Sequence, residues 1–397
     1  MPPVRSKCPL SGRIGGLTHT LSSSHSTTEI GRRKKKKKKK FSIGDLRACI
    51  PAHLFERSAA RSFAYLARDL SLLTAIAYAA THIDAAAAAS GVPAWLLWPL
   101  YWVVQGTVAT GVWVIAHECG HQAFSDSKTL NDAVGLVLHS ALLVPYHPWR
   151  ITHGSHHKNT NHMDRDHVFV PQPRSALHEA AADSPLMAAV HAVLTVTIGW
   201  WLYLTTNATG QKYGRRANHY EPSSPLFKPK DRADVVVSNV ALAVVFAALA
   251  AWAYATSLAT VLCYYWMPYM VVNFYLVTIT LLQHTHVDVP HYRGDEWTFV
   301  RGALATVDRS YGWIINDLQH HIMDSHVAHH LFSTMPHYNA IQATPYLREK
   351  LGVYYKRDDT NFLVALYRAF RDCIFVEDAP AEVLVWKNHK ALAAKAH

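Results

Sequence analysis

The chain has 397 residues, of which 50% are hydrophobic and only 17% are charged, whereas an average soluble domain has roughly 25% charged residues. This deficit of charge indicates a membrane protein. The formal net charge of +11 lies in residues 1–40, and residues 41–397 are neutral overall. Because a nucleic-acid-binding domain spreads basic charge over a folded face, this asymmetry predicts no nucleic-acid partner.

Residues 1–40 are rich in Ser, Thr and Gly and end in two arginines followed by seven lysines. Such a segment buries too little apolar surface to offset the entropy lost on ordering, so we predict a disordered polybasic arm. A nuclear-localisation patch, contact with anionic cytoplasmic lipid and a solvated leader without a catalytic role all stay open for it. Residues 41–397 are predicted to form one membrane domain.

Five later stretches have about the 20 mainly apolar residues that a spanning helix needs. They are residues 70–90, 93–116, 186–206, 234–255 and 258–282. A sixth apolar stretch, residues 133–146, is too short to cross and is predicted to be re-entrant or interfacial.

The number of crossings decides which of these stretches span. If all five crossed, the histidines at 326–330 would emerge on the opposite side from His117. Residues 186–206 are therefore predicted to lie in the interface, because they contain His191 and a Trp200–Trp201 pair and precede a basic loop. The predicted fold is all-α: four transmembrane helices in two hairpins, interfacial helices, and a cytoplasmic His-rich cap with both termini on the cytoplasmic side.

The chain contains 27 histidines, and most of them follow an apolar stretch instead of lying inside one. Three clusters, His-Glu-Cys-Gly-His, His-Gly-Ser-His-His and His-Val-Ala-His-His, place imidazoles at i, i+3 or i+4, which a helix brings to one face. These are metal-ligand spacings. The predicted ligands are His117, His121, His153, His156, His157, His326, His329 and His330.

Eight imidazoles exceed the four ligands of one zinc ion, so two metal ions are predicted. Neutral imidazole suits iron, copper, nickel and zinc, and the ligands alone do not choose between them. A ninth ligand is expected at the end of the last span, where His284 is preferred over His286.

A carboxylate should orient a ligand ring by accepting its other N–H, and Asp324 is the predicted one because it precedes His326 by two residues. An ordinary solvated acid is the alternative interpretation of Asp324. Other acids close to the clusters are Asp126, Asp164, Asp166 and Asp288.

Two other classes of protein compete with an oxidative enzyme. The first cluster matches the zinc-protease signature H-E-x-x-H, in which Glu118 would be the general base. An intramembrane zinc metalloprotease would, however, leave the other two clusters without a purpose. A metal transporter or storage protein would need ionisable groups along a path within the spans, and His82, Asp84 and His191 are the only clear cases.

The three clusters resemble those of the membrane-bound fatty acid desaturases, most closely the acyl-lipid delta-12 and omega-3 branch. Further strings that resemble this branch begin at Val144, Asp166, Leu282 and Arg301, and the third cluster continues as Leu-Phe-Ser-Thr-Met-Pro-His-Tyr. One departure is Gln122, where plant relatives commonly carry another histidine. The likeness covers about residues 41–377.

This resemblance implies a multi-pass endoplasmic-reticulum enzyme that holds two irons and uses O2 and two electrons to desaturate an acyl chain on a phospholipid. The electrons would come from a separate cytochrome b5 and its NADH-dependent reductase. Delta-12 desaturation of oleoyl to linoleoyl is the predicted reaction. An omega-3 (delta-15) desaturase, a bifunctional delta-12/omega-3 enzyme and an acyl hydroxylase are the alternatives.

Overall fold

The computed structural model describes residues 41–176, 184–378 and 380–388, and the predicted polybasic arm lies outside them. The described chain begins with helix α1 (Ile43–Ala48) and the short 3-10 helix η1 (Ala52–Phe55). Ser42 starts α1 with a capping box: its hydroxyl accepts the Asp45 N–H, and the Asp45 carboxylate accepts the Ser42 N–H.

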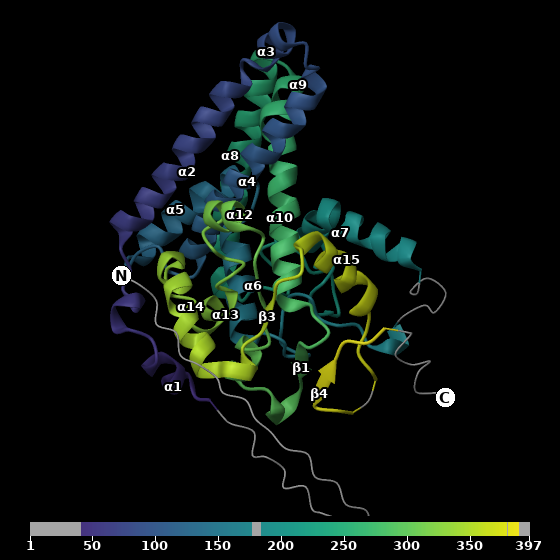
Figure 1. The fold of residues 1–397 in the computed structure, drawn as a ribbon. Coiled ribbons are helices and arrows are strands. Elements are labelled where there is room, and N and C mark those ends of the chain that lie inside the picture. The colour runs from purple at the N-terminus through teal and green to yellow at the C-terminus, as the bar shows by residue number, and fades with distance from the viewer. Residues whose placement is uncertain (1–40, 177–183, 379, 389–397) are drawn as a thin grey trace, which may run out of the picture. The chain divides into compact units, whose positions relative to one another are not determined.

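The first part of the fold consists of long helices and of the shorter helical segments that adjoin them. They are α2 (Ala59–Ala80), α3 (Ile83–Ser90), α4 (Ala94–Gly120), α8 (Arg232–Ala255), α9 (Leu258–Val261), the π-helical turn η4 (Leu262–Trp266) and α10 (Met267–His284). In Figure 1, α2, α4, α8 and α10 extend in broadly the same direction, with α3 and α9 at one end of them.

Four helical segments of the described residues are long and apolar enough to cross a membrane: Ala94–Gly120, Pro185–Thr206, Pro229–Ala255 and Leu258–His284. The helices α2 and α3 pass the same test only as a pair, and they meet at a bend of 50°. This arrangement fits an all-α membrane protein.

The first predicted span, residues 70–90, is not one helix. The helix α2 begins at Ala59, and the chain leaves the helical conformation at His82 before α3. The start was missed because Arg61, Arg68 and Asp69 make the first half of α2 too polar for a hydropathy signal. The break places a histidine between two apolar stretches, where a polar ring can reach the membrane surface.

Helix α7 (Pro185–Thr206) corresponds to the stretch that we predicted to lie in the interface. Its length and composition alone would allow it to span. In Figure 1, however, α7 runs across the direction of α8 and α10 instead of alongside them. The interfacial position remains a prediction, and this orientation favours it.

Glycines let the central helices approach one another closely. A Cβ on Gly106 of α4 would lie 2.4 Å from the Val271 Cβ and 2.6 Å from the Pro268 carbonyl oxygen of α10. Without a strong hydrophobic drive between helices in lipid, such close backbone contact is a main source of stability. The pair α4 and α10 is also the most buried of the long helices.

Shorter elements form a cap at one end of the long helices. Its helices are α5 (Lys128–Ala141), α6 (Tyr146–Asn159), η2 (Arg174–Ala176), η3 (Pro229–Asp231), η5 (Gly294–Glu296), α11 (Phe299–Ala303), α12 (Trp313–Leu318), α13 (His326–Leu331), α14 (His337–Leu351), η6 (Gly352–Tyr354) and α15 (Phe362–Asp372). In the described chain, strand β1 (Pro290–Tyr292) pairs antiparallel with β4 (Val383–Val385), and β2 (Asp308–Arg309) pairs parallel with β3 (Arg357–Asp358). The stretch 133–146 falls mostly within α5, which is amphipathic and only 14 residues long.

Candidate metal centre

The ends of four helices meet and bring the predicted ligands together. The first cluster lies at the C-terminal end of α4, and the second cluster lies within α6. The last residue of α10 is His284, and the third cluster forms the short helix α13. Eight of the nine histidines are buried, and His153 is half-buried. In α4, α6 and α13, helical spacing therefore places the imidazoles of each cluster on one face of the helix, and the end of α10 adds His284.

A first group of five imidazoles could hold one metal ion. Its ligand nitrogens lie within 4.8 Å of one another, and its members are His117, His121, His153, His157 and His329. The Nε2 atoms of His117 and His121 are 3.2 Å apart, as are those of His153 and His157.

A second group adjoins the first and consists of His156, His284 and His330. The His284 Nε2 lies 3.3 Å from the His156 Nε2 and 3.1 Å from the His326 Nε2, so His326 faces this group. The rings of His157 and His330 stack with their centroids 4.0 Å apart, which joins the two groups.

The spacing and the charge state of these rings fit metal ions. With a metal–nitrogen bond of about 2.1 Å, neighbouring ligand nitrogens stand roughly 2.9–3.4 Å apart. Burial lowers the pKa of His121 and of His326 to about 3, so both rings are neutral near pH 7. Several buried ring nitrogens lack any hydrogen-bond partner, among them the Nε2 atoms of His329 and His330. A cation between these lone pairs would satisfy them.

Asp166 is the carboxylate that lies at hydrogen-bond distance from a predicted ligand ring, and the structure contradicts the prediction of Asp324 for that position. The His156 Nδ1 lies 2.6 Å from the Asp166 Oδ1, and both residues are buried. Asp324 instead contacts the His321 ring and the Asn316 amide, neither of which belongs to the two groups. Sequence proximity misled the assignment, because the His326 Nδ1 faces the Ile322 carbonyl oxygen at 3.3 Å instead of the Asp324 carboxylate.

Glu118 does not have the position that the zinc-protease hypothesis requires. Its Oε2 accepts the backbone N–H of His337 at 2.8 Å, and its Oε1 lies 3.6 Å from the His117 Nδ1. The carboxylate therefore lies behind the His117 ring, away from the Nε2 atoms that converge. In a zinc protease the general base must reach the metal-bound water, and that water would lie on the opposite side of the His117 ring from Glu118.

The competitor His286 lies outside both groups. Its ring nitrogens face Asp288 at 3.7 Å and Asp358 at 3.8 Å. His284 is the last residue of α10, whereas His286 follows it in an extended segment and points elsewhere. The preference for His284 thus agrees with the geometry, although metal binding itself remains a prediction.

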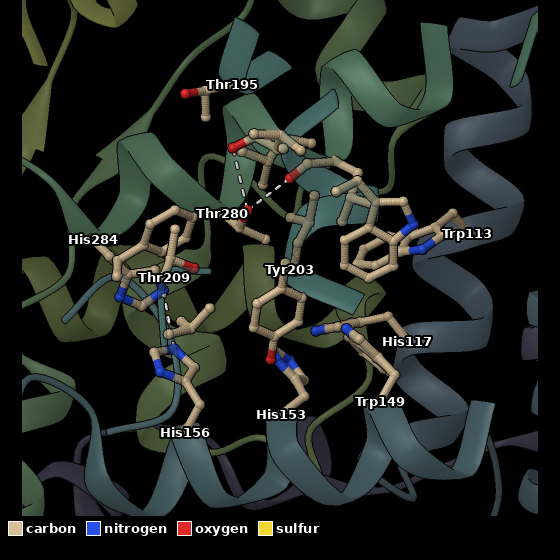
Figure 2. A pocket seen from close by; sticks show the side chains of 18 of the residues that line it. Trp113, His117, Trp149, His153, His156, Thr195, Tyr203, Thr209, Thr280 and His284 are labelled. Atoms are coloured by element: carbon tan, nitrogen blue, oxygen red, sulfur yellow. Dashed lines mark hydrogen bonds between the residues drawn. The ribbon is translucent and has the colours of Figure 1, made fainter. Parts of the chain in front are cut away.

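A narrow, mainly apolar cavity of about 80 Å³, the central cavity, opens onto the histidines. Figure 2 shows His117, His153 and His156 at one end of it and Thr195 at the other. Aromatic side chains line its walls, and Trp149 stacks on the His153 ring with centroids 4.4 Å apart. Such a space suits an unbranched apolar chain that reaches the metal site.

Sequence reasoning missed several lining residues of this cavity. They are Trp113, Trp149, Phe169, Tyr203 and Thr209. Trp149 and Phe169 lie in strings that carried the family resemblance, which was the available signal. Trp113 lies far in the sequence from Tyr203 and Thr209, and the three residues gave no spacing pattern.

Comparisons with known proteins support the same conclusion as the geometry. The family model "Fatty acid desaturase" matches residues 56–361. A Delta(12) fatty acid desaturase of Mortierella isabellina is 48% identical over 85% of this chain and 89% of its own length. A Delta(12)-fatty-acid desaturase of Arabidopsis thaliana is 44% identical over 96% of this chain and 100% of its own length.

An omega-6 fatty acid desaturase of Glycine max, endoplasmic reticulum isozyme 1, is 48% identical over 85% of this chain and 87% of its own length. The family match covers well over half of the chain, and these relatives align with most of their own length. The resemblance inferred from the histidine clusters is thereby confirmed. The chain belongs to the fatty acid desaturase family.

Proposed function

We propose that this protein introduces a cis double bond at the delta-12 position of an oleoyl chain carried on a membrane lipid, giving linoleoyl. The observation that carries the proposal is the apolar central cavity, which is lined by five of the nine histidines that meet from four helix ends. Relatives named delta(12) desaturases, at 44–48% identity, support the position of the double bond.

We further propose that the two histidine groups hold two irons. The donor set is composed of neutral imidazoles, and five plus four rings exceed what one ion binds. When bound, a pair of irons supplies the oxidising chemistry that O2 and two electrons require to remove two hydrogens from an unactivated chain. This choice of metal rests on the family and on the ligand number.

The protein's own residues position the chain and keep water out. Trp113, Trp149 and Tyr203 narrow the cavity next to the histidines, and Asp166 fixes the His156 ring by accepting its Nδ1–H. A fixed ring keeps its Nε2 aimed at the site without reorganisation during the reaction. The apolar walls hold the acyl chain extended, so that its position along the cavity selects the carbon that reacts.

A separate cytochrome b5 with its NADH-dependent reductase is the proposed source of electrons, and the endoplasmic reticulum is the proposed location, with the histidines on the cytoplasmic side. Both proposals rest on the family and on the positive-inside rule. A cysteine introduced at Gly210 tests the orientation. Cytoplasmic labelling of that position is expected, and lumenal labelling would contradict four crossings.

Product analysis tests the proposed reaction. The chain is expressed in a host that makes oleate but no polyunsaturated acids, and its fatty acids are analysed by gas chromatography. We expect linoleate with double bonds at carbons 9 and 12. A double bond at carbon 15, or a hydroxylated product, would instead support one of the alternative activities.

A further inference from the structure

A second cavity, the side groove, lies between α7, the end of α15 and the C-terminal segment, and it has a volume of about 530 Å³. Met187, Ala188 and His191 of α7 form one wall of it, and Phe370, Cys373 and Trp386 form the opposite wall. None of the nine histidines lines this groove, so the metal centre does not account for it.

The side groove and the central cavity share two lining residues, Phe169 and Thr209. The backbone N–H of Val170 donates to the Thr209 carbonyl at 3.1 Å, which holds the two sides of the junction together. The two spaces therefore adjoin at these two residues, a junction that we call the constriction, and Phe169 supplies its largest side chain.

The backbone at Phe169 is unusual. Its φ of +49° is in the left-handed region, which bulky residues rarely adopt. Such strain persists only where neighbouring contacts impose it, and it is concentrated at functional positions. Here the Asp166 carboxylate accepts the Val168 N–H at 3.3 Å while it also contacts His156. The carboxylate that orients a metal ligand therefore also positions the constriction.

The surroundings of the side groove indicate what occupies it. Apolar side chains on the same half of α7 are exposed, with Leu186 at 70% and Val193 at 59%. Exposed apolar surface of this kind on a membrane protein faces lipid. The groove wall is mostly apolar but includes the polar side chains of Gln172 and Thr285. An acyl chain with its ester group matches both features.

We propose that the side groove admits an ester-linked acyl chain directly from the bilayer. The glycerol ester lies in the groove, and the chain passes Phe169 into the central cavity. This inference rests on the proposed function, because it concerns the form in which that substrate arrives. The highly charged carrier of an acyl thioester matches the mostly apolar groove wall less well than a glycerol ester does.

The test compares two tryptophan substitutions on the same helix. Met187→Trp fills the groove wall, whereas Val193→Trp enlarges an exposed residue that lines neither cavity. We expect Met187→Trp to lower linoleate per membrane-integrated protein at least tenfold with unchanged metal content, and Val193→Trp to stay within twofold of wild type. Equal activity of the two variants, or loss of metal along with activity in Met187→Trp, would overturn the proposal.

A second measurement is independent of turnover. A photoreactive benzoylphenylalanine replaces Met187 in the full-length protein in lipid nanodiscs, with either an oleoyl phospholipid in the bilayer or oleoyl-CoA in solution. An adduct with the phospholipid is expected, and an adduct only with the thioester would refute the groove as a bilayer entrance. If the phospholipid adduct forms but wild type makes no linoleate, the proposed function fails while the groove assignment stands.

Discussion

Asp166 offers the sharpest test of how the metal centre is built, because its carboxylate has no substitute among the described contacts of His156. The two groups are 2.6 Å apart and buried. A hydrogen bond to a charged group contributes roughly 1.5–3 kcal/mol, and about 1.4 kcal/mol corresponds to a factor of ten. Loss of a carboxylate that orients a ligand usually costs roughly 10–100-fold in metal affinity or activity. We therefore expect Asp166→Ala to lose one to two orders of magnitude.

Asp166→Asn should have a smaller effect, because its amide oxygen can still accept from the His156 Nδ1, although the amide NH2 then replaces the Oδ2 that accepts the Asn161 N–H at 2.7 Å. The assay is linoleate formed per membrane-integrated protein, together with iron per purified chain at several chelator concentrations. The matched control is Asp324→Asn, since Asp324 contacts neither histidine group. If Asp324→Asn reduces iron retention as much as Asp166→Ala, the assignment of the orienting carboxylate is refuted.

Three further outcomes are expected. His284→Ala should abolish desaturation while His286→Ala keeps most of it, measured by product analysis at equal expression, because only His284 faces the histidine groups. Burial raises the pKa of Asp308 from 3.8 to about 7, so between about pH 4 and 7 the folded state holds a proton that the unfolded state has lost. The stability of the fold should therefore fall as pH rises through this range. Asp308→Asn should flatten this dependence in thermal unfolding followed in detergent. Gly106→Ala should destabilise the protein by roughly 1–3 kcal/mol, since its Cβ would meet the Val271 Cβ at 2.4 Å. Gly154→Ala should be neutral or stabilising, because a Cβ there meets nothing within 4 Å. Unfolding midpoints of the two variants in one detergent test this difference.

The grouping of the histidines could be predicted from the sequence because helical spacing is a local property. The rings at i, i+3 and i+4 lie on one face of a helix whatever the rest of the fold does. The choice of His284 over His286 also followed from a local argument, since His284 ends a long apolar helix. For these residues, the structure adds the division into two adjoining groups.

The orienting carboxylate could not be predicted in the same way, because its contact depends on a return of the chain. Asp166 lies ten residues after His156, beyond the end of α6, and the loop folds back over that helix. Asp324 was closer in sequence to a ligand but faces His321. Proximity along the chain predicts contacts within a helix and fails across a loop.

The helix boundaries show a similar division. Hydropathy located α4, α8 and α10, whose apolar residues form long uninterrupted runs. It missed the polar first half of α2 and the bend between α2 and α3, because the charged residues in that half of the helix resemble a loop in composition. The cavities could not be predicted at all, since residues from α4, α6, α7 and α10 meet only in three dimensions.

The metal content of the active, purified protein tests the central claim most directly. Nine imidazoles in two adjoining groups predict two irons per chain, measured by mass spectrometry of the metals on protein that still converts oleate to linoleate. Removing His157, whose ring belongs to the first group and stacks on the second, should lower both the iron content and the conversion. One zinc per chain in a fully active preparation, or full activity with a single iron, would contradict the account.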